Sequence, residues 1–126
     1  MPQYLFDTDV IIDYLRGIDQ AVKLFETFDS EFTTSAVTVA ELYTGIKGDA
    51  EQHDLAYFLS LFTILPLTEE VAKEAGSMRR TYFKSHGMGL ADAMIAATAQ
   101  AHELTLVSLN ARHFSMLDNM FIPYKK

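Results

Sequence analysis

Short apolar runs alternate with amphipathic segments along this chain of 126 residues. Runs rich in aliphatic, aromatic and β-branched residues predict buried strands at 4–6, 32–35, 63–65 and 104–109, and Phe121-Ile122 is a possible edge strand before Pro123. Between them, apolar residues recur at three- and four-residue spacing, which is typical of helices. The expected helices cover residues 10–15 after Asp9 as a possible N-cap, 21–28, 38–46, 51–62, 68–83 and 90–102.

This alternation of strands and helices predicts an α/β fold around a parallel sheet. Gly17, Gly48 and Gly87 stand where three of the helices are expected to end. The chain has no internal repeat, low-complexity tract or Pro/Gly/Ser-rich linker, so we expect residues 1–126 to form a single domain. A chain of this length can bury a substantial core.

Composition excludes several classes of protein. Hydrophobic residues make up 49% and charged residues 21%, as in ordinary globular proteins, and no apolar run is long enough to span a membrane. There is no cysteine and no recognisable secretion signal, so we expect a cytoplasmic protein. The net charge of -7 argues against simple electrostatic binding to nucleic acid. A phosphate substrate would require a cation.

Acidic residues stand where the predicted strands lead into helices. Asp7 and Asp9 follow the first strand, Glu41 lies in a mostly apolar helix, and Asp92 lies just inside the start of a small-residue helix. The last strand is followed by polar residues, namely Ser108, Asn110 and His113. In an open parallel sheet, ligands bind at the carboxyl ends of the strands. We therefore expect these four segments to meet at one crevice, where carboxylates can hold a hard divalent cation.

Each acid also has a purely structural explanation. Asp9 is a good helix N-cap, and Asp92 is stabilised near a helix N-terminus by the helix dipole. Glu41 alone is consistent with a solvated helix position. Only their combination indicates a functional site.

Three segments, taken in order, resemble the motifs of a known family: FDTDVIIDYL, VAELYTGI and GLADAMIAATAQAHELTLVSLNARHF. They are similar to the successive motifs of PIN-domain ribonucleases, and specifically to the small stand-alone VapC toxins of type II toxin-antitoxin pairs. The match in order and spacing extends from Tyr4 to about Phe114.

The resemblance implies a three-layer α/β/α PIN-like domain with a parallel sheet of four or five strands. It implies an endoribonuclease that uses Mg²⁺ or Mn²⁺, with Asp7, Glu41 and Asp92 as the metal ligands. From its place after the last strand, Asn110 is a further candidate catalytic residue. The implied partners are an RNA substrate, a cognate VapB-like antitoxin and a second copy of the chain in a homodimer. No membrane association is expected.

The chain departs from the family pattern at two places. Thr8 matches the small polar residue after the first acid, but Asp9 takes a place more often held by Asn or Ser. Many members carry another Asp near the last strand, where this chain has Ser108, Asn110 and His113. His113 either replaces that acid or serves in packing or RNA contact, which leaves the number of bound metal ions open.

Two other functional classes are consistent with parts of the pattern. Asp7-Thr8-Asp9 also resembles the DxD start of haloacid-dehalogenase phosphatases, in which the first Asp is a covalent nucleophile. The later acidic pair that such enzymes need is missing. The second alternative is a non-catalytic PIN scaffold that binds RNA or a partner, and the changed fourth motif keeps it open.

Overall fold

The computed structural model describes residues 3–126, which form five short strands and six helices. Their order along the chain is β1 (Tyr4–Phe6), α1 (Thr8–Leu15), α2 (Asp19–Thr27), β2 (Thr33–Ser35), α3 (Ala36–Thr44), α4 (Asp49–Leu59), β3 (Thr63–Leu65), α5 (Glu69–His86), α6 (Leu90–Ala101), β4 (Thr105–Val107) and β5 (Met120–Phe121).

All strand pairs are parallel. β1 pairs with β4 and β4 with β5, while β2 pairs with β3 as a separate hydrogen-bonded group. β1 and β2 lie side by side, and the hydroxyl of Thr34 donates a 2.7 Å hydrogen bond to the carbonyl of Phe6 between them. The strand order is therefore β3-β2-β1-β4-β5. Between β2 and β1 this hydrogen bond from the Thr34 side chain takes the place of a ladder of backbone hydrogen bonds. The predicted parallel arrangement of four or five strands is confirmed, with the five strands divided into a three-stranded and a two-stranded hydrogen-bonded group.

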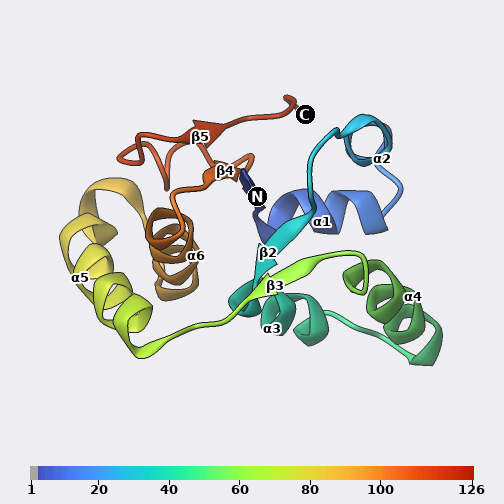
Figure 1. Ribbon diagram of the computed structural model, residues 1–126, viewed down its shortest axis with the longest axis horizontal. Coiled ribbons are helices and arrows are strands. Elements are labelled where there is room, and N and C mark those ends of the chain that lie inside the picture. Colours follow the sequence, from blue (N-terminus) through green and yellow to red (C-terminus); the bar gives the residue numbers. More distant parts are fainter. Residues whose placement is uncertain (1–2) are drawn as a thin grey trace.

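Helices cover both faces of the sheet. In Figure 1, α5 and α6 lie on one side of the strands and α1, α2 and α4 on the other. Side chains alternate between these faces along each strand: Leu5 and Leu106 pack toward α5 and α6, while Phe6 and Val107 pack toward α1, α2 and α4. The expected three-layer α/β/α architecture is confirmed.

The two cores differ in composition. Small residues of α6 bring that helix close to the sheet and to α5; Ala93 and Ala96 are fully buried. The opposite core is aromatic, with the ring of Phe6 4.7 Å from that of Phe25 and 4.9 Å from that of Phe28. Edge-to-face and tilted aromatic pairs of this kind add to the hydrophobic stabilisation.

The structure shifts several predicted boundaries by a few residues. The helix expected from residue 51 begins at Asp49, the strand expected over 104–109 is limited to Thr105–Val107, and the edge strand begins at Met120. Gly87 adopts a left-handed conformation with φ of 67°, which ends α5 as predicted and favours glycine there.

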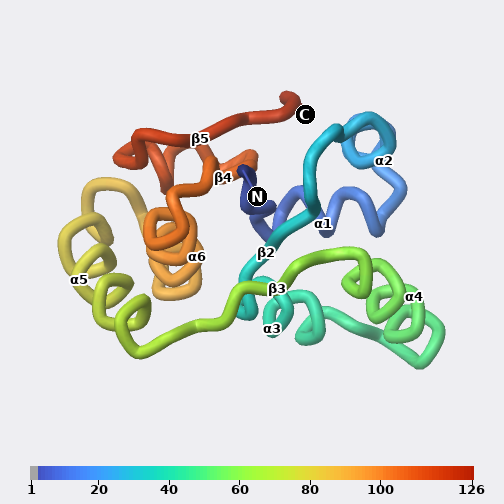
Figure 2. Tube along the Cα trace, viewed as in Figure 1, coloured from blue at the N-terminus to red at the C-terminus, as the bar shows by residue number. Residues whose placement is uncertain are grey.

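The C-terminal tail returns to the first two helices. Figure 2 shows the chain running from β5 toward α1 and α2. Tyr124 and Lys126 both contact Asp13 of α1, and Gln20 of α2 donates a hydrogen bond to the carbonyl of Lys125. Among residues 3–126, no helix combines the length and apolar character that crossing a bilayer requires.

Candidate active site

Asp7 connects β1 directly to α1. Its backbone is extended, its Oδ1 accepts a 2.7 Å hydrogen bond from the amide of Thr8, and its Oδ2 accepts a 2.7 Å bond from Ser108 Oγ. Asp7 is therefore the N-cap of α1, and the prediction that Asp9 caps this helix is wrong. The helix starts immediately after the strand, which places Asp9 in its first turn.

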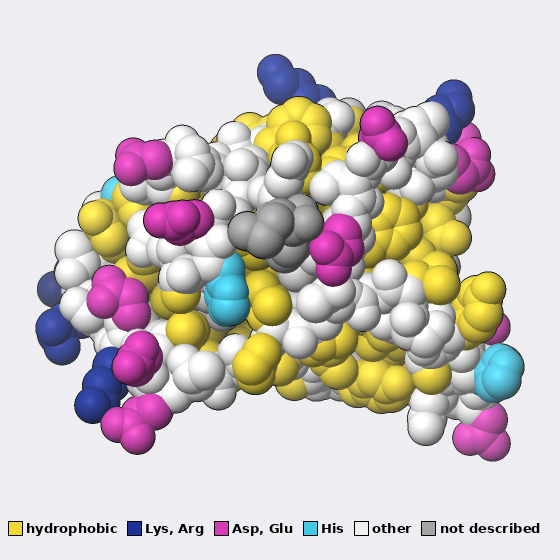
Figure 3. Space-filling view, in the orientation of Figure 1, with side chains coloured by type: hydrophobic (Ala, Val, Ile, Leu, Met, Phe, Trp, Pro, Cys, Tyr) yellow, Lys and Arg dark blue, Asp and Glu magenta, His cyan; other side chains and the backbone are white. Residues whose placement is uncertain are grey.

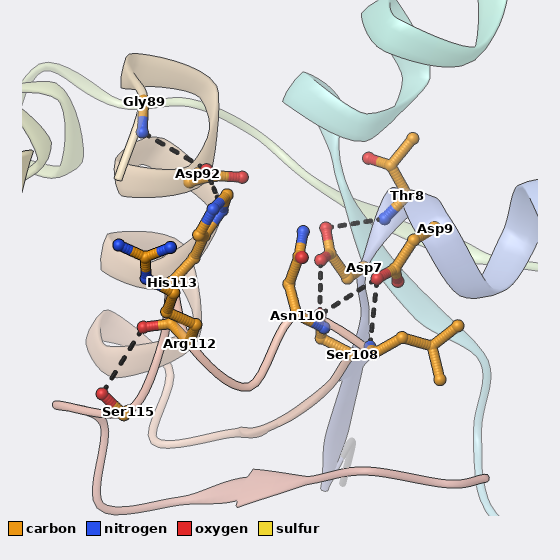
Figure 4. Close-up of polar contacts among 11 residues, drawn as sticks. Asp7, Thr8, Asp9, Gly89, Asp92, Ser108, Asn110, Arg112, His113 and Ser115 are labelled. Atoms are coloured by element: carbon orange, nitrogen blue, oxygen red, sulfur yellow. Dashed lines mark hydrogen bonds and ion pairs between the residues drawn. The ribbon is translucent and has the colours of Figure 1, made fainter. Parts of the chain in front are cut away.

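Asp9 instead links α1 to the segment after β4. Its Oδ2 accepts a 3.0 Å hydrogen bond from the amide of Leu109 and a longer 3.4 Å bond from Ser108 Oγ (Figure 4). Its Oδ1 is buried and has no hydrogen-bond partner among the described residues. Asp9 therefore joins the first and last of the predicted motifs at one place.

A chain of hydroxyl groups leads to Glu41. Thr8 Oγ1 lies 2.6 Å from Glu41 Oε1 and 3.0 Å from Thr38 Oγ1, and Ser35 Oγ lies 3.3 Å from Thr38 Oγ1. Since the carboxylate only accepts, Thr8 donates to Glu41 and takes its own hydrogen bond from Thr38. The exposed Glu41 side chain is thus held at Thr8, the residue that follows Asp7, by buried threonines.

Asp92 lies in the first turn of α6, as predicted. Its Oδ2 accepts a 3.3 Å hydrogen bond from the amide of Gly89, the N-cap residue, and lies 2.9 Å from Nδ1 of His113. The contact with His113 is a feature that the sequence pattern did not indicate.

Asn110 follows β4 at the edge of the crevice. Its amide donates a 3.0 Å hydrogen bond to Ser108 Oγ, which in turn donates to Asp7. Figure 4 shows the exposed Asn110 side chain projecting into the space between Asp7 and Asp92. The side-chain carboxamide of Asn110 is therefore available to a molecule that enters this space.

Burial and like charge dominate the electrostatics of the crevice. Burial raises the pKa of the Asp7 carboxyl from 3.8 to about 7, helped by the negative charges of Asp9 and, less strongly, Asp92, while hydrogen bonds from Ser108 and Thr8 oppose this increase. Burial also raises the pKa of Asp9, against the hydrogen bond from the Leu109 amide. Within residues 3–126, no Lys or Arg forms an ion pair with these acids or with Glu41.

The structure thus brings the predicted residues to the carboxyl edge of β1 and β4. Figure 4 shows the Asn110 side chain between Asp7 and Asp92, and Glu41 is joined to the start of α1 through Thr8, although no three acidic or histidine side chains of the described chain form a compact ligand group. Sequence reasoning missed the roles of Thr8 and His113. Thr8 stood next to a candidate ligand in the sequence, but its bond to Glu41 joins residues 33 positions apart.

Comparisons with known proteins identify the family. Residues 4–119 match the PIN domain. Ribonuclease VapC10 from Mycobacterium tuberculosis is 38% identical over 95% of this chain and 92% of its own length, and ribonuclease VapC2 from Haemophilus influenzae is 32% identical over 90% and 91%.

Solved structures agree with these relatives. A toxin-antitoxin complex from Klebsiella pneumoniae aligns with a TM-score of 0.85 at 28% identity, covering 98% of this chain and all of that one. FitAcB from Neisseria gonorrhoeae aligns with a TM-score of 0.77 at 32% identity, covering 96% and 98%. The haloacid-dehalogenase alternative finds no support in this fold. The chain belongs to the PIN-domain family, in the branch of the VapC ribonucleases.

Proposed function

We propose that this chain is a metal-dependent endoribonuclease and the toxin of a type II toxin-antitoxin pair. The observation that carries the proposal is that Asp7 lies close to the charges of Asp9 and Asp92, while Glu41 is held by Thr8, the residue after Asp7. In the part of the chain that the structure describes, no Lys or Arg forms an ion pair with these acids. The relatives named as VapC ribonucleases supply the reaction, which is hydrolysis of RNA phosphodiester bonds.

The donor set fits a divalent cation. Hard cations such as Mg²⁺ and Mn²⁺ take oxygen ligands, and Mg²⁺ is often held by one or two carboxylates together with water and substrate phosphate. Asp7, Glu41 and Asp92 offer such oxygens, and burial together with the charges of Asp9 and Asp92 raises the pKa of Asp7, an effect that a bound cation would oppose.

The residues around the crevice have separate tasks in this proposal. The chemistry supplied by a bound cation is activation of water and neutralisation of the charge that grows on the phosphodiester. Ser108 holds the Asp7 carboxylate, Thr8 holds Glu41, and Asp9 fixes the loop that presents Asn110. Asn110 would donate a hydrogen bond to a phosphate oxygen and so orient the RNA.

The direct test is incubation of the purified chain with total RNA, with Mg²⁺, with Mn²⁺ or with EDTA, followed by mapping of the new RNA ends. We expect discrete cleavage sites with either metal and none with EDTA. Glu41→Gln should remove the cleavage as well, since it removes ligand charge at nearly constant volume. RNA binding without cleavage under all conditions would support the non-catalytic scaffold instead.

The partners follow from the same proposal. Structural relatives are complexes of toxins with antitoxins, and beside Glu41 this chain has a largely apolar groove lined by Ile12, Leu15, Arg16, Leu42 and Ile46. We propose that a VapB-like antitoxin covers this region and that the toxin forms a homodimer. Co-expression with the product of the neighbouring gene should suppress RNA cleavage, and light scattering should give twice the monomer mass.

The negative charge of the protein affects how it can bind RNA, which is itself negatively charged. Figure 3 shows acidic side chains spread over one face of the molecule, with Lys and Arg at its margins. Electrostatic attraction alone therefore does not explain RNA binding by a chain with a net charge of -7. The proposal accordingly predicts that RNA binds more weakly when the divalent cation is removed.

A further inference from the structure

His113 occupies a defined place between three segments of the chain. Its Nδ1 lies 2.9 Å from Asp92 Oδ2 at the start of α6. Its Nε2 lies close to Gly87 at the end of α5, 3.5 Å from the point that a Cβ would occupy if this glycine carried one. The neighbouring Phe114 is fully buried and anchors the loop that carries His113. The imidazole is thus fixed by the fold rather than extended into solvent.

The contact with Asp92 is well placed to be effective. The two side chains are partly buried, with 32% of His113 and 24% of Asp92 exposed, so water competes less with their hydrogen bond than at an open surface. A carboxylate only accepts hydrogen bonds, so the proton of this bond lies on Nδ1 of His113.

This bond determines which oxygen of Asp92 faces the crevice. Oδ2 receives both the His113 imidazole and the amide of Gly89. Figure 4 shows the second oxygen of Asp92 directed away from these donors, toward the side on which Asp7 and Asn110 lie. A carboxylate held in this way presents one free oxygen in a fixed direction.

We propose that His113 is a positioning residue that orients Asp92 for the divalent cation, and that it does not bind the ion itself. The inference rests on the proposed metal-dependent function. Imidazole is a poor ligand for Mg²⁺, and Nδ1 is already engaged with the carboxylate. Hydrogen bonds to metal-binding side chains fix their orientation, and their loss commonly lowers metal affinity by 10- to 100-fold.

Replacing His113 by side chains that carry a hydrogen-bond donor at different positions tests whether the bond from Nδ1 to Asp92 is what matters. Asn places its amide nitrogen close to where Nδ1 lies in His, whereas the longer Gln places it close to Nε2. His113→Asn should therefore keep the bond to Asp92, and His113→Gln and His113→Ala should lose it. His102→Ala is the matched control, because His102 is exposed at the opposite end of α6.

The test is calorimetric titration of Mn²⁺ into the full-length chain, with RNA cleavage measured in parallel. We expect Mn²⁺ to bind about 10-fold more weakly to His113→Ala and His113→Gln, while His113→Asn and His102→Ala stay within about threefold of wild type. In the cleavage assay the Mn²⁺ concentration that gives half-maximal cleavage should rise by a similar factor in the same two variants. The thermal midpoint of the metal-free variants should change by no more than about 2 °C.

Two results would overturn the inference in different ways. Wild-type Mn²⁺ affinity in His113→Ala, or an affinity in His113→Asn as weak as that of His113→Ala, would exclude positioning by Nδ1 while leaving the metal-dependent function standing. Failure of the wild-type chain to bind Mn²⁺ at all would overturn the proposed function, and the inference with it.

Discussion

Two aspartates near opposite ends of α1 are equally buried, but only one of them has a positively charged partner in the described part of the fold. Asp7 and Asp13 are each 3% exposed. Asp13 accepts a 2.8 Å hydrogen bond from the hydroxyl of Tyr124 and forms a 3.0 Å ion pair with Lys126. Asp7 accepts hydrogen bonds from uncharged donors only, and its charged neighbours are acids.

The difference separates a carboxylate with a charged partner in the fold from the one that we propose as a metal ligand. A buried charge is costly unless it is paired, and the C-terminal tail provides that pairing for Asp13. Burial, the hydrogen bond to Asp13 and the charge of Asp13 raise the pKa of Tyr124 above its ordinary value, so its hydroxyl keeps the proton that it donates to Asp13. At Asp7 no Lys or Arg forms an ion pair with the carboxylate among the described residues, which agrees with the proposed binding of a cation there.

The largest expected effect is on RNA cleavage, at the start of α1, where the Asp7 carboxylate has no positively charged partner among the described residues. Asp7→Asn and Asp92→Asn should each lower RNA cleavage by at least about 1000-fold, because each removes ligand charge where the metal supplies several kcal/mol of transition-state stabilisation. Cleavage of a defined RNA under single-turnover conditions measures this loss. Near wild-type cleavage by either variant, with metal present, would exclude that residue from the site.

Replacing Asp13, which has a charged partner in the C-terminal tail, should instead affect the stability of the fold. Asp13→Ala removes the acceptor of Tyr124 and the partner of Lys126, and we expect it to lower the free energy of unfolding by about 2–3 kcal/mol. The value is below that of a fully buried ion pair because Lys126 is half-exposed. Urea unfolding measures it. Tyr124→Phe should cost less, about 1 kcal/mol, and a neutral result for both variants would show that the tail is not fixed to α1.

The pH dependence of stability should report the charge of Asp7. Its pKa is about 7 in the folded protein against 3.8 as the ordinary value, so between these limits the folded state binds more protons than the unfolded state. The stability of the metal-free protein should therefore rise as the pH falls from 7 to 5, by about 2 kcal/mol. Asp7→Asn should flatten this profile. A profile with the opposite slope that Asp7→Asn leaves unchanged would show that Asp7 is ionised without penalty.

A smaller effect is expected at the hydroxyl chain. Thr8→Val keeps the shape of the side chain but removes the donor to Glu41, and we expect roughly 10-fold weaker Mn²⁺ binding. Thr8→Ser keeps the hydroxyl and serves as the control. Equal affinities in the two variants would show that Glu41 reaches the metal without help from Thr8.

Much of the fold followed from the sequence because its signals are local. The alternating apolar pattern predicted the parallel strands and their helices, and it placed Asp7 directly after β1 and Asp92 in the first turn of α6, where the structure has them. The N-cap of α1 was placed wrongly because Asp7 and Asp9 suit the position equally well by residue type. Only the point at which the strand ends decides between them.

The remaining features depend on long-range contacts that leave no pattern in the sequence. The bond between His113 and Asp92 spans 21 positions, and the contacts of Asp13 with the tail span more than 100. Asp13 and Asp7 therefore look alike in the sequence, as acids beside an amphipathic helix. Their difference appears only when the tail is seen to return to α1.

Calorimetric titration of Mn²⁺ into wild type, Asp7→Asn and Asp13→Asn at pH 7 tests the central claim most directly, since the two variants change equally buried aspartates of one helix segment. The account predicts binding to wild type and to folded Asp13→Asn, and loss of binding in Asp7→Asn. Equal Mn²⁺ binding by wild type and Asp7→Asn would contradict it, because the uncompensated carboxylate would then have no part in holding the metal.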